Sequence, residues 1–174
     1  MKNLQAIIAV AAVVLQLVSP CVQAEDAVSD KESLRGITLI GVTIGKISHT
    51  AKKIGMHRDS LRESIALKLR TEGIRVATPD ELHADAATPY LQVTLFVSYS
   101  KPTYMYTVMV GLNEKVHLVR DPKIVSYAMP WWRIMRGEHV GTPGIQQEVE
   151  DSLRKLLKEF VDDYFSVNAR QAIK

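Results

Sequence analysis

Histidine side chains are the first residues of this sequence whose type could support metal binding or proton transfer. The five histidines are His49, His57, His83, His117 and His139. None of them has a second ligand at the separation typical of zinc sites, and Gly55 interrupts the stretch between His49 and His57, so no helical metal pair forms there. We therefore interpret the histidines as surface residues and expect no metal site.

Acidic pairs and glycine-rich stretches are the next candidates for catalysis. Adjacent or near-adjacent acids occur at Asp80/Glu81, Glu148/Glu150 and Asp162/Asp163. A glycosidase needs two carboxylates that converge in a cleft, whereas these pairs fall in an expected loop or on the polar side of an expected helix. The stretch "GVTIGK" lacks the complete phosphate-loop motif, and no serine nucleophile elbow occurs. We expect a protein that is not an enzyme and needs no cofactor.

Aromatic side chains are the remaining candidates, and Trp131 and Trp132 are the only tryptophans. Neighbouring side chains on an extended strand point to opposite faces. One face of a sheet therefore cannot hold both indoles, and we predict that one is core and the other is exposed or half-covered. In an alternative arrangement, Pro130 ends the strand and Trp132 folds over the sheet edge.

Two interpretations of the aromatic residues remain open. In the first, most of them pack the sheet against helices, with hydroxyls and indole nitrogens reaching water. In the second, a helix-free face of the sheet exposes part of the set as a patch for a protein or glycan partner. The candidate partner-binding residues are Trp131, Trp132, Tyr104 and Tyr127.

The elements that must position these residues begin with a β-α-β unit. We predict strands at 36–45 and 74–78 around a helix at 58–73, followed by a loop at 80–89. Ser60 and Glu63 form a possible capping box at the start of the helix, and Gly73 is placed as its left-handed stop. The two strands of such a unit run parallel.

Three alternating segments and a long helix follow. We predict strands at 90–100, 104–120 and 124–132 and a helix from Pro143 to about Val167. Short turns join the strands, so they form an antiparallel meander. Thr142 is the expected cap of the helix, Pro143 its first residue, and apolar side chains recur along it at steps of three and four.

This element order, β-α-β-β-β-β-α, predicts an α/β fold of the α+β type. It is a two-layer sandwich with a mixed sheet, a three-stranded antiparallel meander and two helices on one face. The order, and the passage "LKLRTEGIRVATPDEL" at 67–82, resemble the small α/β module of bacterial envelope proteins over residues 36–167. Examples are the amino-terminal domain of the Tol-Pal translocation protein and the periplasmic domain of the curli secretion channel. The resemblance implies binding or assembly in the envelope, and it carries over no functional residues.

Residues 1–24 have the pattern of an export signal. Lys2 precedes the apolar stretch "AIIAVAAVVLQLV" at 6–18, which is too short for a comfortable membrane span, and the residues up to Ala24 suit signal-peptidase cleavage after it. We therefore expect a periplasmic or secreted protein with no transmembrane segment after cleavage.

The division of the chain follows from this signal. Cys21 is the only cysteine, and Pro20 before it disfavours the alternative of a lipid anchor. We expect a flexible leader at 25–35, a single α/β domain at 36–168 and a short tail at 169–174. Without Cys21 the mature chain has no disulfide, so burial of a core must stabilise it.

The net charge of the chain limits the classes of partner that it is expected to bind. The whole chain has a formal net charge of +3, and its basic residues are interspersed with acids. Such a balance does not indicate nucleic-acid binding. The first hypothesis is a non-enzymatic periplasmic accessory module that docks onto another envelope protein. The alternative is a small-ligand or glycan-binding domain that uses an aromatic sheet face.

Overall fold

The computed structural model describes residues 30–169. The elements are η2 (Asp30–Leu34), β1 (Gly41–Ile47), α2 (His49–Lys53), α3 (Arg58–Thr71), α4 (Pro79–Ala84), β2 (Tyr90–Ser100), β3 (Thr103–Leu118), β4 (Asp121–Val140) and α5 (Ile145–Val167). The expected export signal, Cys21 within it and most of the expected tail lie outside the described residues.

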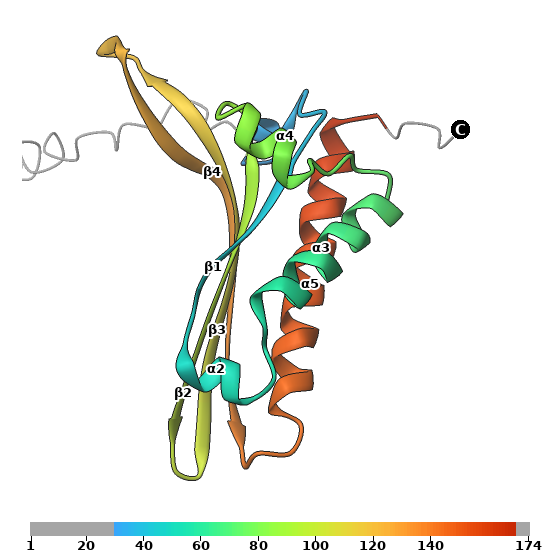
Figure 1. Ribbon diagram of the computed structural model, residues 1–174, viewed down its shortest axis with the longest axis vertical. Coiled ribbons are helices and arrows are strands. Elements are labelled where there is room, and N and C mark those ends of the chain that lie inside the picture. Colours follow the sequence, from blue (N-terminus) through green and yellow to red (C-terminus); the bar gives the residue numbers. More distant parts are fainter. Residues whose placement is uncertain (1–29, 170–174) are drawn as a thin grey trace, which may run out of the picture.

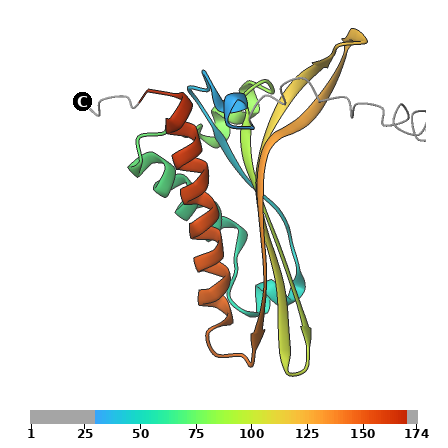
Figure 2. The same ribbon diagram turned by 180° about the vertical axis from the view of Figure 1, so that it is seen from behind.

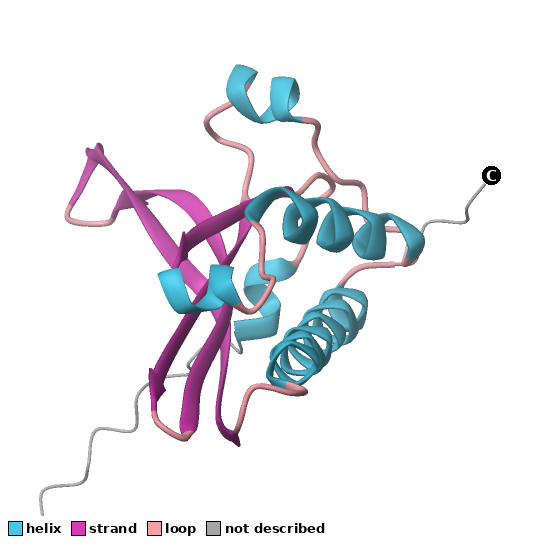
Figure 3. Cartoon of the chain, turned by 60° about the horizontal axis from the view of Figure 1, so that its bottom comes forward, coloured by secondary structure: helices cyan, strands magenta, loops and turns pink. Residues whose placement is uncertain are grey.

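One mixed sheet forms the first layer of the fold. Its strand order is β1-β2-β3-β4, with β1 parallel to β2 and the other neighbours antiparallel. The helices α3 and α5 cover one face of this sheet, as the two opposite views show (Figure 1 and Figure 2). The same arrangement is visible when the molecule is turned by 60° about the horizontal axis, with the helices on one side of the strands (Figure 3). The predicted two-layer architecture with a three-stranded meander and two helices on one face is confirmed.

Strict alternation builds the face of the sheet that the helices cover. Alternate residues of β2 and β3 are buried against them: Leu91, Val93, Leu95, Val97, Tyr104, Tyr106, Val108, Val110 and Leu112. The helix α5 contributes the predicted apolar stripe, including Val149, Leu153, Leu156, Phe160 and Tyr164. The core therefore lies between this face of the sheet and the helices.

The start of α5 differs from the sequence prediction. The helix begins at Ile145, and its N-cap is Gly144 in the left-handed region (φ 89°), where glycine is favoured because it has no Cβ. Thr142 is therefore not the cap, and Pro143 lies before the helix. The carbonyl of Pro143 instead lies 2.7 Å from Nε2 of the His139 ring.

The predicted β-α-β unit needs two corrections. The residue before α3 is His57, which makes no side-chain capping bond, so the predicted box at Ser60 is wrong. A capping box does form one element later, where Thr78 and Glu81 open α4 inside the expected loop. The expected strand at 74–78 is only an isolated parallel bridge, so β2 is the strand parallel to β1. The left-handed stop at Gly73 (φ 89°) is confirmed.

The last strand is much longer than predicted. The sequence predicts a strand at 124–132, whereas β4 runs from Asp121 to Val140. The β3–β4 register shifts where Leu112 pairs with Trp131 but Glu114 pairs with Ala128, so β4 holds an extra residue there. Pro130 falls in this bulge of an edge strand, where a missing amide proton costs no ladder bond.

The described part of the expected leader is folded. Leu34 of η2 is fully buried, and Arg133 of β4 forms a salt bridge with Asp30. The end of α5 completes the attachment, because the side-chain amide of Asn168 accepts from the Gly36 amide and donates to the Leu34 carbonyl (both 2.8 Å). Residues 30–35 therefore belong to the domain, because their apolar and charged groups find partners on β4 and α5.

Candidate functional site

The helix-free face of the sheet is the candidate functional surface. Its side chains alternate with the core residues: Gln92, Thr94, Phe96 and Ser98 on β2, Met105, Thr107 and Met109 on β3, and Trp132, Ile134, Arg136 and Glu138 on β4. The pairing aligns them in rows across three strands, for example Phe96, Thr107 and Arg136. These residues form a shared surface because side chains opposite one another on a sheet lie close together.

Large apolar side chains on this face remain exposed. The exposed fractions are 51 % for Trp132, 57 % for Phe96 and 46 % for Met105. Single exposed apolar residues are common on any protein, but several on one flat face indicate an interaction surface. The helix-free face therefore has the composition of a contact surface.

A shallow hollow of about 460 Å³ lies within this face. Phe96 and Met105 supply its apolar lining, and Ser98, Arg136 and Glu138 supply polar groups. Such a combination offers a ring surface for stacking and charged groups that can orient a polar ligand.

Glycine shapes the neighbouring part of the face. A Cβ on Gly111 would lie 2.3 Å from the sulfur of Met129, so only glycine lets this side chain lie across β3. Met129 comes from the bulged part of β4, and it extends the apolar surface beside Trp132. The bulge therefore widens the contact surface as well as accommodating Pro130.

The β3–β4 hairpin continues beyond the layered part of the fold. We call residues 114–128 the β3–β4 arm; it projects past the helices in Figure 1. Exposed apolar side chains gather along it, at Val119, Ile124, Val125 and Tyr127. A two-stranded ribbon with exposed apolar side chains gains stability when a partner covers it.

The two tryptophans divide as predicted between core and surface. Trp131 is 0 % exposed, packs edge-to-face on Phe160 at 5.0 Å between ring centroids, and donates from Nε1 to Asp163 at 3.0 Å. The guanidinium carbon of Arg133 lies 4.9 Å from the centroid of the same ring. Trp132 points to the helix-free face. Trp131 therefore supports the surface from behind and cannot itself contact a partner.

The tyrosine candidates divide in the same way. Tyr104 is buried on the helix-covered face, where its ring lies 4.5 Å from that of Tyr99. It is not a surface residue, because its position in β3 has the same parity as the core residues. Tyr127 is exposed on the β3–β4 arm. Of the four candidate residues, Trp132 and Tyr127 are therefore exposed, whereas Trp131 and Tyr104 are buried.

Three contributors were missing from the sequence-based set. Phe96 could have been found, because the alternation of 90–100 already places it on the face opposite the core residues. Met105 had the same signal, because the alternation of 104–120 places it on the face opposite Tyr106 and Val108. Arg136 had none, because it lies beyond the predicted strand and its place beside Phe96 depends on the register between three strands. Pairing register is set by tertiary packing as well as by the local sequence.

One polar cluster outside this face has residue types found in catalysis. His139 lies between two acceptors, with Nδ1 2.6 Å from a Glu148 carboxylate oxygen and Nε2 2.7 Å from the Pro143 carbonyl. The carbonyl bond and then the carboxylate raise the pKa of His139. Tyr106 donates to the other oxygen of Glu148 at 3.0 Å, and Ser152 lies 3.2 Å from the same hydroxyl. Both ring nitrogens are engaged, so His139 has no free nitrogen with which to activate a nucleophile.

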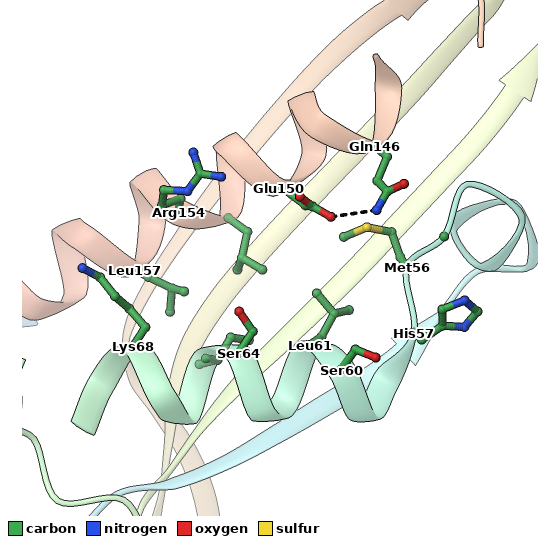
Figure 4. A pocket seen from close by; sticks show the side chains of 13 residues that line it. Met56, His57, Ser60, Leu61, Ser64, Lys68, Gln146, Glu150, Arg154 and Leu157 are labelled. Atoms are coloured by element: carbon green, nitrogen blue, oxygen red, sulfur yellow. Dashed lines mark hydrogen bonds between the residues drawn. The ribbon is translucent and has the colours of Figure 1, made fainter. Parts of the chain in front are cut away.

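A second hollow, of about 430 Å³, separates α3 from α5 (Figure 4). Gln146 donates to Glu150 one turn further along α5 at 2.9 Å, while Lys68 pairs with Glu72 and Arg154 with Asp151, each three or four residues away in the sequence. None of these three pairs joins a nucleophile to a base, so they hold side chains in place and have no arrangement typical of catalysis. Within residues 30–169, no group of three or more histidine, cysteine or acidic residues is placed to hold a metal ion. Over the same residues, no helix has the length and apolar character needed to span a bilayer.

Solved structures similar to this chain include a PelC dodecamer and a lipoprotein. No protein-family model matches the chain. No curated protein matches it. The PelC dodecamer from Paraburkholderia phytofirmans is 18 % identical with a TM-score of 0.39, over 75 % of this chain and 90 % of that chain. Lipoprotein GNA1162 from Neisseria meningitidis is 11 % identical with a TM-score of 0.27, over 72 % of this chain and 99 % of that chain. Neither is the Tol-Pal or the curli protein that the sequence pattern resembles.

Proposed function

We propose that this chain is an exported, non-enzymatic accessory module that docks onto another protein of the cell envelope. The observation that carries the proposal is the helix-free face, where Trp132, Phe96 and Met105 remain exposed on adjacent strands. The signal pattern at 1–24 supports export, and Cys21 within it leaves the cleaved chain without disulfides. The β3–β4 arm extends the same surface.

The energetic argument rests on the type of side chain. Tryptophan and other aromatic residues supply most of the binding free energy at protein interfaces, because they bury a large area with few rotatable bonds. Arg136 and Glu138 flank the exposed apolar residues and would form the polar rim. A partner with a complementary apolar patch fits this face.

Site-specific photo-crosslinking in cells tests the proposal. A photoreactive phenylalanine analogue at Phe96 should give a discrete crosslinked product with an envelope protein, and Trp132→Ala should remove it. Leu67 is a matched control, because it is 65 % exposed but lies on α3, away from this face. Equal crosslinking from both positions, or none from Phe96, would contradict docking through the helix-free face.

A second candidate function is glycan or small-ligand binding in the hollow beside Phe96. The observation that favours it is the juxtaposition of one exposed ring with Arg136 and Glu138. Cell-wall fragments should then shift the fluorescence of Trp132, which lies on the same face, and Phe96→Ala should abolish the shift. No response across a panel of fragments and lipids would remove this candidate.

A further inference from the structure

A second surface lies beside the free edge of β1. A groove of about 570 Å³ is bounded there by α3 on one side and α4 at one end. Its floor is apolar and consists of Val42, Ile44, Ala66, Val76 and Ala77. It shares no lining residue with the hollow of the helix-free face.

Three arginines of α3 line this groove on one side. Arg58, Arg62 and Arg70 all line the groove, and the spacing of four residues places Arg58 and Arg62 one above the other on the helix. Arg58 donates from Nη2 to the carbonyl of Gly45 at 3.0 Å, which places this row of cations directly beside β1. Glu63 is the acid among the lining residues. The groove is therefore electropositive.

The cations are available for a ligand. Arg62 pairs at 3.2 Å with Asp59, whose side chain is largely exposed, and such surface pairs are weak. Arg70 has no ion pair within the part of the chain that the structure describes, and it is exposed. An incoming carboxylate can therefore bind these guanidinium groups without first breaking a strong interaction.

The edge of β1 offers backbone hydrogen bonds to the same ligand. Ile40 bonds outward to segment 75–77, whereas the amide of Gly41 bonds toward β2 (2.8 Å from nitrogen to the carbonyl oxygen). Peptide groups alternate along a strand, and the β1–β2 register is regular from Gly41 to Ile44. Val42 and Ile44 therefore direct their amide and carbonyl groups to the edge that faces away from β2, and both residues line the groove.

We propose that this groove binds an extended, acidic segment of a partner protein, which adds a strand to β1 and places its carboxylates on the arginines of α3. The row from Arg58 to Arg70 spans about 18 Å, at 1.5 Å per helical residue. Carboxylates on every second residue of a strand lie about 6.6 Å apart. Two helical residues that are four positions apart in the sequence are separated by about 6 Å along the helix axis, which is a similar distance. A segment that carries an acid at every second residue thus satisfies the arginines and the strand edge together.

This occupant is favoured over an anionic lipid. A headgroup could bind the arginines and an acyl chain could cover the floor, but neither would satisfy the free peptide groups of Val42 and Ile44 in the way a strand does. The proposal concerns a surface other than the helix-free face, so it goes beyond the function proposed above and does not depend on it.

Fluorescence anisotropy with a model peptide gives the first test. The probe is a fluorescein-labelled peptide of about seven residues that alternates glutamate with valine, long enough to extend over about 18 Å. The purified protein should bind it at low salt and bind a lysine–valine peptide of the same length far more weakly. Affinity should fall as salt rises, because exposed charges are screened. Equal binding of the two peptides would overturn the proposal.

Paired variants locate the binding to the groove. The double variant Arg62→Gln with Arg70→Gln should weaken binding of the acidic peptide about tenfold, the sum of two exposed ion pairs. Arg154→Gln is the matched control, because Arg154 is an exposed arginine on α5 that does not line this groove. Trp132→Ala should leave binding of this peptide unchanged, which separates failure of this proposal from failure of the proposed function. An unaffected double variant would refute the assignment.

Amide hydrogen exchange tests the added strand. The amides of Val42 and Ile44 should exchange more slowly when the acidic peptide is bound, and a peptide N-methylated on the residues facing β1 should neither bind nor protect them. Unchanged exchange at both amides with bound peptide would refute strand addition. Arginine-dependent binding to phosphatidylglycerol vesicles without binding of the peptide would show that the occupant is a lipid headgroup and that the proposal is wrong.

Discussion

Truncation of the two adjacent tryptophans should have very different consequences for stability. Trp131→Ala removes an indole that is 0 % exposed and packs on Phe160 and Arg133. Replacement of a buried tryptophan by alanine costs about 3–5 kcal/mol. Asp163, the acceptor of the indole N–H, keeps its 2.8 Å bond from Arg133, so no additional unpaired charge is left behind. We therefore expect a loss of about 3–5 kcal/mol.

Trp132→Ala should cost about 0.5 kcal/mol, because the side chain is 51 % exposed and lies on the helix-free face. Urea unfolding followed by far-UV circular dichroism measures both variants without using tryptophan as the probe. The free energy of unfolding of a domain is about 5–15 kcal/mol, so Trp131→Ala removes a large part of it. This variant should unfold at a much lower urea concentration, and its Tm should fall by about 10–20 °C.

Fluorescence quenching supplies the control. Trp131→Phe leaves Trp132 as the sole tryptophan, and its emission should be quenched readily by acrylamide. Trp132→Phe leaves Trp131, whose emission should be blue-shifted and protected. Equal loss of stability in the two alanine variants, or equal quenching in the two phenylalanine variants, would refute the division into one core and one surface indole.

Three further predictions concern the supports of the fold. The pKa of His139 is raised in the folded protein, so protonated His139 contributes its full stabilisation below about pH 6.5, the pKa of an unfolded histidine. This contribution declines as the pH rises through the pKa of His139 in the folded protein. The urea midpoint should therefore fall more over this pH range in the wild type than in His139→Gln. Gly137→Ala would place a Cβ 2.3 Å from the hydroxyl oxygen of Tyr106, and the forced displacement should cost about 1–3 kcal/mol in the same assay. Arg133→Met would remove the guanidinium partner of Asp163, whose side chain is only 14 % exposed. The loss of stability should be about 1–3 kcal/mol. A variant as stable as the wild type would show that Arg133 does not stabilise the Asp163 carboxylate.

Periodicity of apolar residues in the sequence was sufficient to predict the two layers of this fold. Apolar residues at every second position of 90–100 and at steps of three and four after Ile145 each specify one buried face, and both faces are buried as expected. The same alternation separates Trp131 from Trp132. These signals are reliable because burial of a whole face involves many residues, so one exception does not change the outcome.

Caps, register and the length of β4 depend on contacts that the local sequence does not contain. Thr142 has a suitable side chain for a cap, but the loop places Gly144 at that position. Residues 133–140 mix charges with glycine and do not have the composition of a strand, yet they pair with β3 throughout. Pairing with an existing strand can outweigh local β-propensity. The candidate surface shares this limitation, since Phe96 and Arg136 become neighbours only through the register.

The bonds between the two ends of the described chain have a consequence for the order of folding. Asn168 bonds to Leu34 and Gly36, residues more than 130 positions earlier in the chain. Contacts between residues so far apart in the sequence require closure of a long loop, which lowers the entropy of the chain. They therefore form after local hairpins and helices. We therefore expect Asn168→Ala to leave the folding rate almost unchanged and to accelerate unfolding, as interactions absent from the transition state do. The junction of η2 with α5 would then determine how long the native state persists, and not how quickly it is reached.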